Sequence, residues 1–212
     1  MNKRRFLAAA ALIAAMPFAS FAQSQDSVAP RELTLEEISA YLNDLGSVST
    51  TFTQVNWDNS ISTGELLLKR PGRIRLEYDE PDSGLMMAFG GNLAIFDKKS
   101  NEPPERYPVR RTPLWLLLER NVDLTDQKMV VGHGFDGEKT YVEAMDPKRP
   151  EHGSIRLKFS SNPVELTEWV VFDAHGGETL VALGELDHDV EIPNRVFNIM
   201  RMIQQLVPEE NR

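Results

Sequence analysis

Residues 64–78 read GELLLKRPGRIRLEY, two apolar-rich segments separated by the turn sequence Arg70-Pro71-Gly72. After the turn, Ile74, Leu76 and Tyr78 alternate with charged residues, which is the period of a half-buried β-strand. Pro fixes one backbone angle and Gly accepts angles that other residues avoid, so the tripeptide suits a tight turn. The stretch therefore predicts a pair of antiparallel strands.

The same period recurs along most of the chain after residue 46. Ile155, Leu157 and Phe159 alternate with polar residues, and residues 180–186 form another short apolar segment. Turn sequences separate such segments at 70–72, 80–84, 90–92, 136–137, 161–163 and 176–177. They predict a mainly β protein of about nine to eleven antiparallel strands, each joined to the next by a short hairpin. A meander of this width must curl, split into two sheets or close.

A helix is predicted ahead of these strands. Thr34, with Glu37 three residues later, forms the capping-box pattern that begins a helix, and Gly46 ends it. The apolar residues fall on one helical face and are Leu35, Ile38, Leu42 and Leu45. The pattern indicates an amphipathic helix of about twelve residues that packs by this face.

A second helix interrupts the strands after the polar, Pro-rich segment 98–112. Thr112 suits the N-cap, Pro113 the first helical position and Asn121 the end. The residues between them are apolar nearly all round, so the helix must face apolar surface on more than one side. Two interpretations remain open: a core helix that plugs the curled sheet, or a lid over an apolar cavity that holds a lipid.

Residues 1–22 have the three parts of a secretory signal peptide. A basic segment at 2–5 precedes an apolar run from Phe6 to Met16, and residues 17–22 end in the small-x-small pattern of a cleavage site. We expect cleavage after Ala22, because a run of about a dozen apolar residues is shorter than the roughly 20 needed to cross a membrane. The pattern predicts export of the mature chain.

The rest of the chain has the organisation of one domain. Residues 23–33 predict a flexible leader, 34–207 a single domain and 208–212 a frayed tail. Residues 196–207 predict an amphipathic helix that packs either on this chain or on a partner. Its apolar residues are Val196, Ile199, Met200, Ile203 and Val207.

Composition excludes several kinds of chemistry. None of the 212 residues is cysteine, so disulfides, thiolate metal ligands, a cysteine nucleophile and a lipidated cysteine are absent. The net charge is −9, and it becomes −12 without residues 1–22 because 20 basic and 32 acidic residues remain. Such a chain repels phosphate backbones and anionic membranes, so we expect no nucleic acid partner.

Catalytic and metal-binding patterns are weak. Residues 132–137 match G-x-G-x-x-G, but the strand-like segment after them predicts a glycine hairpin, because a phosphate site needs a helix there. The histidines at 133, 152, 175 and 188 lie in turn-like or strand-end contexts and lack metal-ligand spacing. We therefore expect no enzymatic activity, no metal and no cofactor.

Several segments together resemble the periplasmic outer-membrane lipoprotein carrier family (LolA). The similarity rests on VSTTFTQ at 48–54, the 64–78 stretch, Pro81, GGNLAIFD at 90–97, Thr112-Pro113-Leu114 and LTEWVVFD at 166–173. It spans roughly residues 34–199, and its most specific part is the spacing of F-T-Q, G-x-L and R-P-G-R-x-R.

The resemblance implies an unclosed antiparallel β-barrel whose concave face is covered by the two helices. It implies an apolar cavity that carries lipoprotein acyl chains across the periplasm. The partners would be an inner-membrane ABC-type releasing complex and an outer-membrane acceptor. The acceptor relative is anchored by a lipidated cysteine, so a chain without cysteine is expected to be the soluble carrier. We also expect a monomer or a weakly associating protein. By the same resemblance Arg70 is a latch that holds the lid closed through hydrogen bonds to the lid backbone.

The expected site residues form two further groups. The lid consists of Pro113, Leu114, Trp115, Leu116, Leu117 and Leu118. The cavity wall takes one alternating set of strand residues, and a one-residue error in register would invert that set. The expected wall residues are Leu66, Leu68, Ile74, Leu76, Met87, Phe89 and Ile95.

Three alternatives to a lipoprotein carrier remain open. A regulator with the same fold would detect mislocalised lipid, although such regulators usually append a second domain and residues 23–212 leave little room for one. A carrier of another lipid would have the same cavity. A β-sandwich interaction module would have no cavity and would not bind a fluorescent fatty acid.

Overall fold

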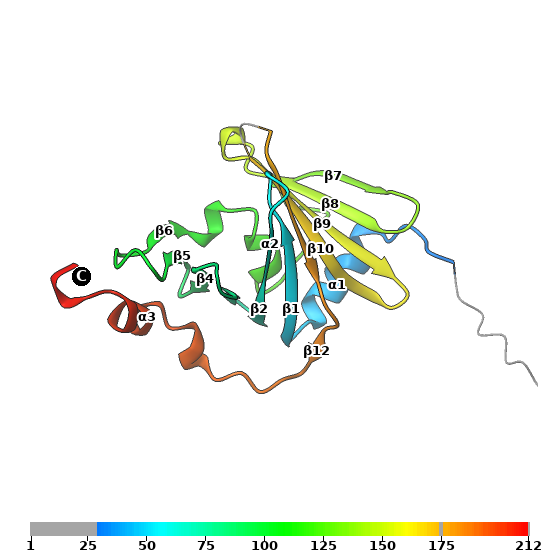
Figure 1. Ribbon diagram of the computed structural model, residues 1–212. Helices are drawn as coiled ribbons and strands as arrows, with labels where there is room; N and C mark the ends of the chain where they lie inside the picture. Colours follow the sequence, from blue (N-terminus) through cyan, green and yellow to red (C-terminus); the bar gives the residue numbers. More distant parts are fainter. Residues whose placement is uncertain (1–28, 174–175, 212) are drawn as a thin grey trace, which may run out of the picture.

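The computed structural model describes residues 29–173 and 176–211, so the signal-peptide prediction for residues 1–22 lies outside the described residues. The described chain forms one curved antiparallel sheet with three α-helices (Figure 1). The strands are β1 (Ser47–Val55), β2 (Ile61–Lys69), β3 (Arg73–Tyr78), β4 (Gly84–Phe89), β5 (Asn92–Asp97), β6 (Glu105–Pro108), β7 (Val130–Phe135), β8 (Thr140–Met145), β9 (Ser154–Ser161), β10 (Val164–Phe172), β11 (Glu178–Leu183) and β12 (Asp187–His188).

The sheet consists of two meanders, β1–β6 and β7–β11, which join where β1 pairs with β11. Its order is β6-β5-β4-β3-β2-β1-β11-β10-β9-β8-β7, and β12 adds a two-residue pairing with β1. Strands β6 and β7 are the two edges and do not pair, which confirms an unclosed antiparallel sheet. The described residues form twelve strands, one more than the upper end of the predicted nine to eleven. Between β6 and β7 the segment 109–129 crosses from one edge to the other, at the place where the sequence predicts that a helix interrupts the strands.

Helix α1 (Leu35–Asp44) begins as its sequence predicts. The Thr34 hydroxyl accepts the Glu37 N–H, and the Glu37 carboxylate accepts the Thr34 N–H, which completes the capping box. Ile38 and Leu42 are fully buried and belong to the main apolar core with β1–β3, β8–β10 and α2. The helix therefore covers part of the concave face.

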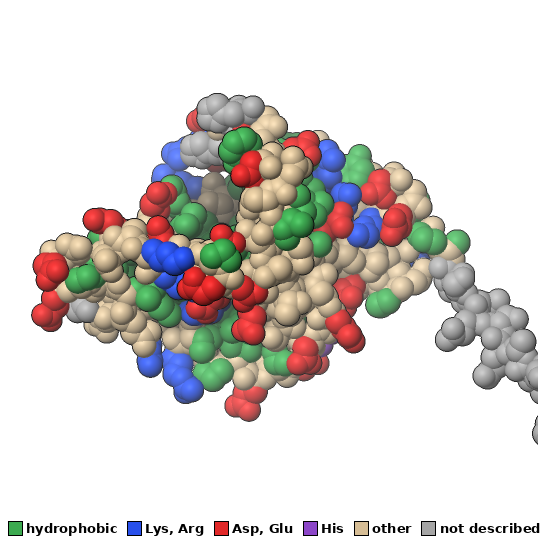
Figure 2. Space-filling model, in the orientation of Figure 1, with side chains coloured by type: hydrophobic (Ala, Val, Ile, Leu, Met, Phe, Trp, Pro, Cys, Tyr) green, Lys and Arg blue, Asp and Glu red, His purple; other side chains and the backbone are tan. Residues whose placement is uncertain are grey.

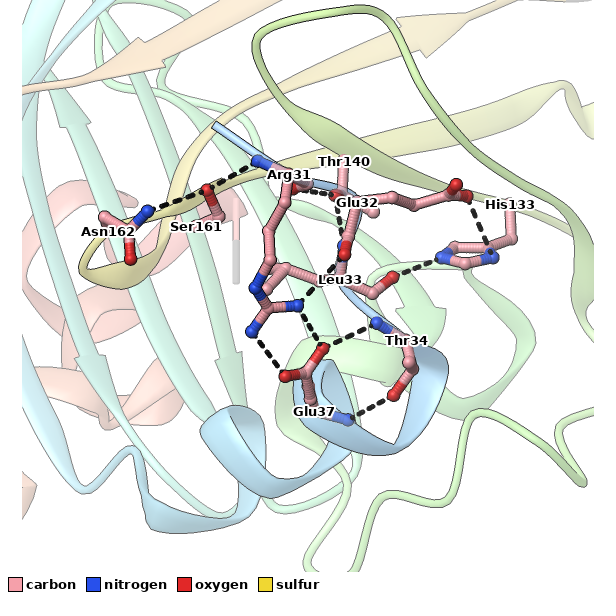
Figure 3. Close-up of polar contacts among 9 residues, drawn as sticks. All are labelled: Arg31, Glu32, Leu33, Thr34, Glu37, His133, Thr140, Ser161 and Asn162. Carbon is pink, nitrogen blue, oxygen red and sulfur yellow. Dashed lines mark hydrogen bonds and ion pairs between the residues drawn. The ribbon is translucent and has the colours of Figure 1, made fainter. Parts of the chain in front are cut away.

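The segment before α1 is fixed to the sheet, although the sequence places it in a flexible leader. Leu33 is completely buried, its N–H donates to the Thr140 hydroxyl at 2.7 Å, and His133 Nε2 lies 2.8 Å from its carbonyl oxygen (Figure 3). The Arg31 N–H donates to the Ser161 hydroxyl, and its guanidinium binds Glu37. Order therefore begins ahead of Thr34.

Helix α2 (Trp115–Leu118) is shorter than its sequence predicts. The Thr112 hydroxyl donates to the Val109 carbonyl instead of capping the helix, and the first N–H groups reach back three residues. Leu116, Leu117 and Leu118 are completely or almost completely buried, as an all-round apolar helix requires.

The segment after α2 is tied to α1. Asn43 Nδ2 donates to the Val122 carbonyl, and Asn43 Oδ1 accepts the Val122 N–H, each at 2.8 Å. The Leu124 N–H donates to the Ser39 hydroxyl at 3.0 Å. Val122 and Leu124 are buried, so the chain that crosses between the sheet edges is part of the core.

Helix α3 (Ile199–Leu206) covers the opposite face of the sheet. Ile199, Ile203 and Val207 pack with alternate residues of β4 and β5 in a second apolar cluster. The helix therefore packs on its own chain (Figure 1). The expected tail forms a 3-10 turn at Glu209–Asn211. No helix among the described residues has the length and apolar content needed to cross a membrane.

The two hydrogen bonds between the Asn43 side chain of α1 and the Val122 backbone predict the effect of Asn43→Ala. Loss of the amide leaves two backbone groups of buried Val122 without partners, which costs about 1–3 kcal/mol. Urea unfolding should show this decrease, and hydrogen exchange should speed up in residues 119–126. The control Asp44→Ala, on the exposed side of the same turn, should change stability by less than about 0.5 kcal/mol. Equal effects of the two variants would contradict the assignment.

The Arg31 contact predicts how acid affects the N-terminal anchor. The hydrogen bonds from Arg31 and from the Thr34 N–H lower the pKa of Glu37 from 4.5 to about 2. A lowered folded-state pKa stabilises the fold above the unfolded value and loses this contribution as pH falls toward the folded value. Glu37→Gln should thus destabilise the protein at neutral pH, and its difference from the parent should shrink by about pH 3. Glu36→Gln, in the same helical turn, is the matched control, and equal pH profiles of the two variants would contradict the role of the Arg31 contact.

Candidate functional site

An enclosed apolar pocket lies where the two halves of the sheet meet beneath α2. Its walls come from α1, from β1–β3, from β10–β11 and from α2. The lining residues are Tyr41, Leu45, Val48, Leu66, Leu68, Ile74, Leu117, Leu166, Trp169, Leu183 and Leu186. We call this space the central pocket. Four of its residues, Leu66, Leu68, Ile74 and Leu117, belong to the expected cavity wall and lid.

The central pocket is nearly filled by the protein itself. Its volume is about 20 Å³, which is room for one water molecule at most. Leu117 points into it from α2 and is 1% exposed. The central pocket therefore has no room for a ligand unless the residues that line it move apart.

The pairing register of the strands explains which of the predicted wall residues lie on the concave face of the sheet. Leu66 pairs with Leu76, and Leu68 pairs with Ile74, so these four share the concave face. Met87 and Phe89 were predicted to line the cavity, but they pack with α3 on the opposite face. Ile95 pairs with Met86, which packs against the main core, but Ile95 is 42% exposed and lies outside the central pocket.

Trp169 is a lining residue that alternation along β10 does not reveal. It lies three residues after Leu166, so in a regular strand the two would point to opposite faces. The pairing of β10 with β9 shifts between Leu166 and Glu168, which turns both side chains toward the central pocket. The only sequence signal is a large aromatic residue in a strand with broken alternation.

Arg70 connects the β2–β3 turn with the end of α2. Its Nη2 donates to the carbonyl oxygen of Glu119, the residue that follows the helix. Its Nε is buried and has no acceptor among the described residues. Burial lowers the pKa of Arg70, and the Glu119 carboxylate opposes that shift. Arginine nevertheless stays charged, so a half-buried cation depends on very few polar contacts here.

A second contact closes the same end of α2. The Gly72 N–H donates to the Leu118 carbonyl at 2.8 Å, and Gly72 has a φ of +77°. Other residues rarely adopt this angle, so Gly72 is required for the turn that brings its N–H to α2. The turn 70–72 therefore holds two consecutive carbonyl groups, those of Leu118 and Glu119.

Comparison with known proteins identifies the family. A family model described as "Outer membrane lipoprotein carrier protein LolA" matches residues 43–200. The outer-membrane lipoprotein carrier protein of Chromohalobacter salexigens is 26% identical over 176 residues, which cover 77% of this chain and 82% of that protein. The protein of the same description from Alkalilimnicola ehrlichii is 28% identical over 181 residues and covers 78% of both chains.

Solved structures with related folds are distant in sequence. A putative outer membrane lipoprotein-sorting protein domain from Vibrio parahaemolyticus has a TM-score of 0.49 and 9% identity, covering 82% of this chain and 98% of that one. A LolA superfamily protein from Nitrosomonas europaea has a TM-score of 0.41 and 12% identity, covering 78% of this chain and 98% of that one. Because the family model spans well over half of the sequence, the chain belongs to the LolA family of outer membrane lipoprotein carrier proteins.

Proposed function

We propose that this protein shields lipoprotein acyl chains in the central pocket and carries them through the periplasm from the inner to the outer membrane. The observation that carries the proposal is the contact between Arg70 and the Glu119 carbonyl, placed beside an apolar helix that fills the pocket. Family membership supports the same cargo class. In this account α2 is a lid and Arg70 is its latch.

The closed pocket suits a carrier that must also release its cargo. Burial of each methylene stabilises by about 0.8 kcal/mol, so two or three acyl chains represent tens of kcal/mol. In this structure, which the proposal takes as the closed state, Leu117 lies in the place that cargo takes, and Leu116 and Leu118 are buried next to it in α2. The empty carrier therefore buries its own apolar surface, and the cargo replaces the lid in the central pocket.

The latch has the strength needed to bias this exchange without preventing it. A charge-assisted hydrogen bond contributes about 1.5–3 kcal/mol, which is small beside the gain from buried acyl chains. The unpartnered Nε indicates that the guanidinium is not fully satisfied in the closed state. Cargo can displace the contact between Arg70 and the Glu119 carbonyl, and when this contact forms again it favours release of the cargo.

The proposal includes the route of the protein and its partners. The signal peptide, cleaved after Ala22, delivers the chain to the periplasm. Cargo comes from an inner-membrane ABC-type releasing complex and passes to an outer-membrane acceptor. The acidic surface is spread over the face shown in Figure 2 and keeps the carrier away from anionic membranes.

Native mass spectrometry of protein purified from the periplasm tests the cargo directly. We expect adducts with the mass of a lipoprotein or its acylated N-terminus. A lipid adduct without protein would indicate a carrier of another lipid. Absence of any adduct, together with no binding of a fluorescent fatty acid, would remove the carrier function.

Arg70→Leu tests the latch. The variant should stay folded, because Leu fills the same half-buried space and leaves no unpartnered Nε. It should bind cargo but transfer it to acceptor-containing membranes about tenfold more slowly, since the closed state loses its main polar contact. The control Arg195→Leu removes an exposed cation on the other face and should transfer normally. Normal transfer by Arg70→Leu would rule out the latch.

A further inference from the structure

A second pocket lies beside the latch at the end of the sheet. It is open to solvent, has a volume of about 550 Å³, and lies where the turns 70–72 and 90–91 meet the chain on both sides of α2. Three arginines border it: Arg73 after the first turn, Arg110 before α2 and Arg120 after α2. We call it the arginine pocket. Phe89 and Trp115 add apolar surface, and Glu119 adds the one acidic side chain.

The three arginines gather around one hollow of a chain whose net charge is −9. In the same sheet Arg75 pairs with Glu77 and Arg156 with Glu143. Within the part of the chain that the structure describes, no carboxylate lies within 4.0 Å of the guanidinium groups of Arg73, Arg110 or Arg120. Three cations around one hollow, none of them paired with a carboxylate of the described residues, favour an anionic ligand.

Local contacts orient these charges without neutralising them. The Arg110 guanidinium lies 4.5 Å from the centre of the Trp115 ring, an arrangement that keeps its edge free for hydrogen bonds. Arg73 Nη1 makes a long contact of 3.4 Å with the Pro71 carbonyl. Glu119 Oε2 is occupied by the Gln127 amide at 2.7 Å. Donors from three directions suit the several oxygens of a phosphate group better than one planar carboxylate.

We propose that the arginine pocket binds a phosphate group. The phosphate can be a lipid head group or free inorganic phosphate, and position favours the lipid. Arg73 precedes Ile74 of the central pocket, and Trp115 and Glu119 flank Leu117 of the central pocket. A lipid whose chain replaces the lid therefore leaves its head group beside these arginines. The lipid form rests on the acyl-binding central pocket of the proposed function and adds a phosphate-bearing lipid to the lipoprotein acyl chains proposed there, whereas the phosphate site itself does not rest on that function.

Calorimetric titration with two matched probes tests the proposal. Lysophosphatidic acid and a monoacylglycerol with the same acyl chain differ only in the phosphate, and both are used below their micelle-forming concentrations. We expect the phosphate lipid to bind at least about tenfold more tightly, with the difference shrinking as salt rises. Arg73→Gln/Arg120→Gln should abolish the difference and leave monoacylglycerol binding unchanged. Arg111→Gln, next to the pocket but outside its lining, is the matched control.

Other outcomes separate the sources and the classes of ligand. If neither acyl probe binds but inorganic phosphate does, with the same arginine dependence, the proposed carrier function fails and the site binds free phosphate. Equal binding of the two acyl probes to the parent, or a preference that survives the double variant, overturns the phosphate site. If a short polyglutamate peptide shows the arginine dependence instead, the pocket takes an acidic protein segment and the proposal is wrong.

Discussion

The concave face of the open sheet is apolar and has to be covered, and the rest of the structure follows from this constraint. A closed barrel would cover this face with its own strands, but β6 and β7 remain apart. Helix α1, helix α2 and the crossing segment cover it instead, with Leu33, Leu117 and Val122 buried against it. The capping box, the Asn43 bridge and the Arg31 anchor all hold pieces of this cover in place.

The cover is unevenly attached, and this links the fold to the proposed function. The segments on both sides of α2 have specific partners, since Asn43 binds Val122 and the Val109 N–H donates to the Gly91 carbonyl. Helix α2 itself is one turn long and is held at its end by the turn 70–72 through Gly72 and Arg70. Apolar contacts supply the rest, and acyl chains can supply the same contacts. In the proposed function, helix α2 is therefore the part of the cover that cargo replaces.

Sequence periodicity predicts the fold well where one face of an element is polar. It identifies α1 with its cap, the strands around 70–72 and β9, because alternation or helical spacing is clear in each. It fails at β4, whose sequence GLMMAF is buried by the core on one face and by α3 on the other, so Met87 is assigned to the wrong face. It misses Trp169 because a bulge in β10 breaks the alternation of buried and exposed residues. It also misplaces the start of α2, because the Thr112 hydroxyl donates to the preceding Val109 carbonyl instead of capping the helix. The Arg70 contact joins residues 49 positions apart, which periodicity cannot show and only the family resemblance suggested.

Contact between an acyl chain and Trp169 is the most direct test of whether acyl chains enter the central pocket. In a Trp57→Phe/Trp115→Phe background the fluorescence comes from Trp169 alone, which is 4% exposed in the closed state. Bromine-labelled acyl chains quench tryptophan only on contact. If acyl chains occupy the central pocket, a brominated monoacylglycerol should quench Trp169 strongly and saturably, and brominated glycerol should quench it little. Binding of the acyl probe without quenching of Trp169 would show that the lipid lies elsewhere and would exclude the central pocket as its binding site.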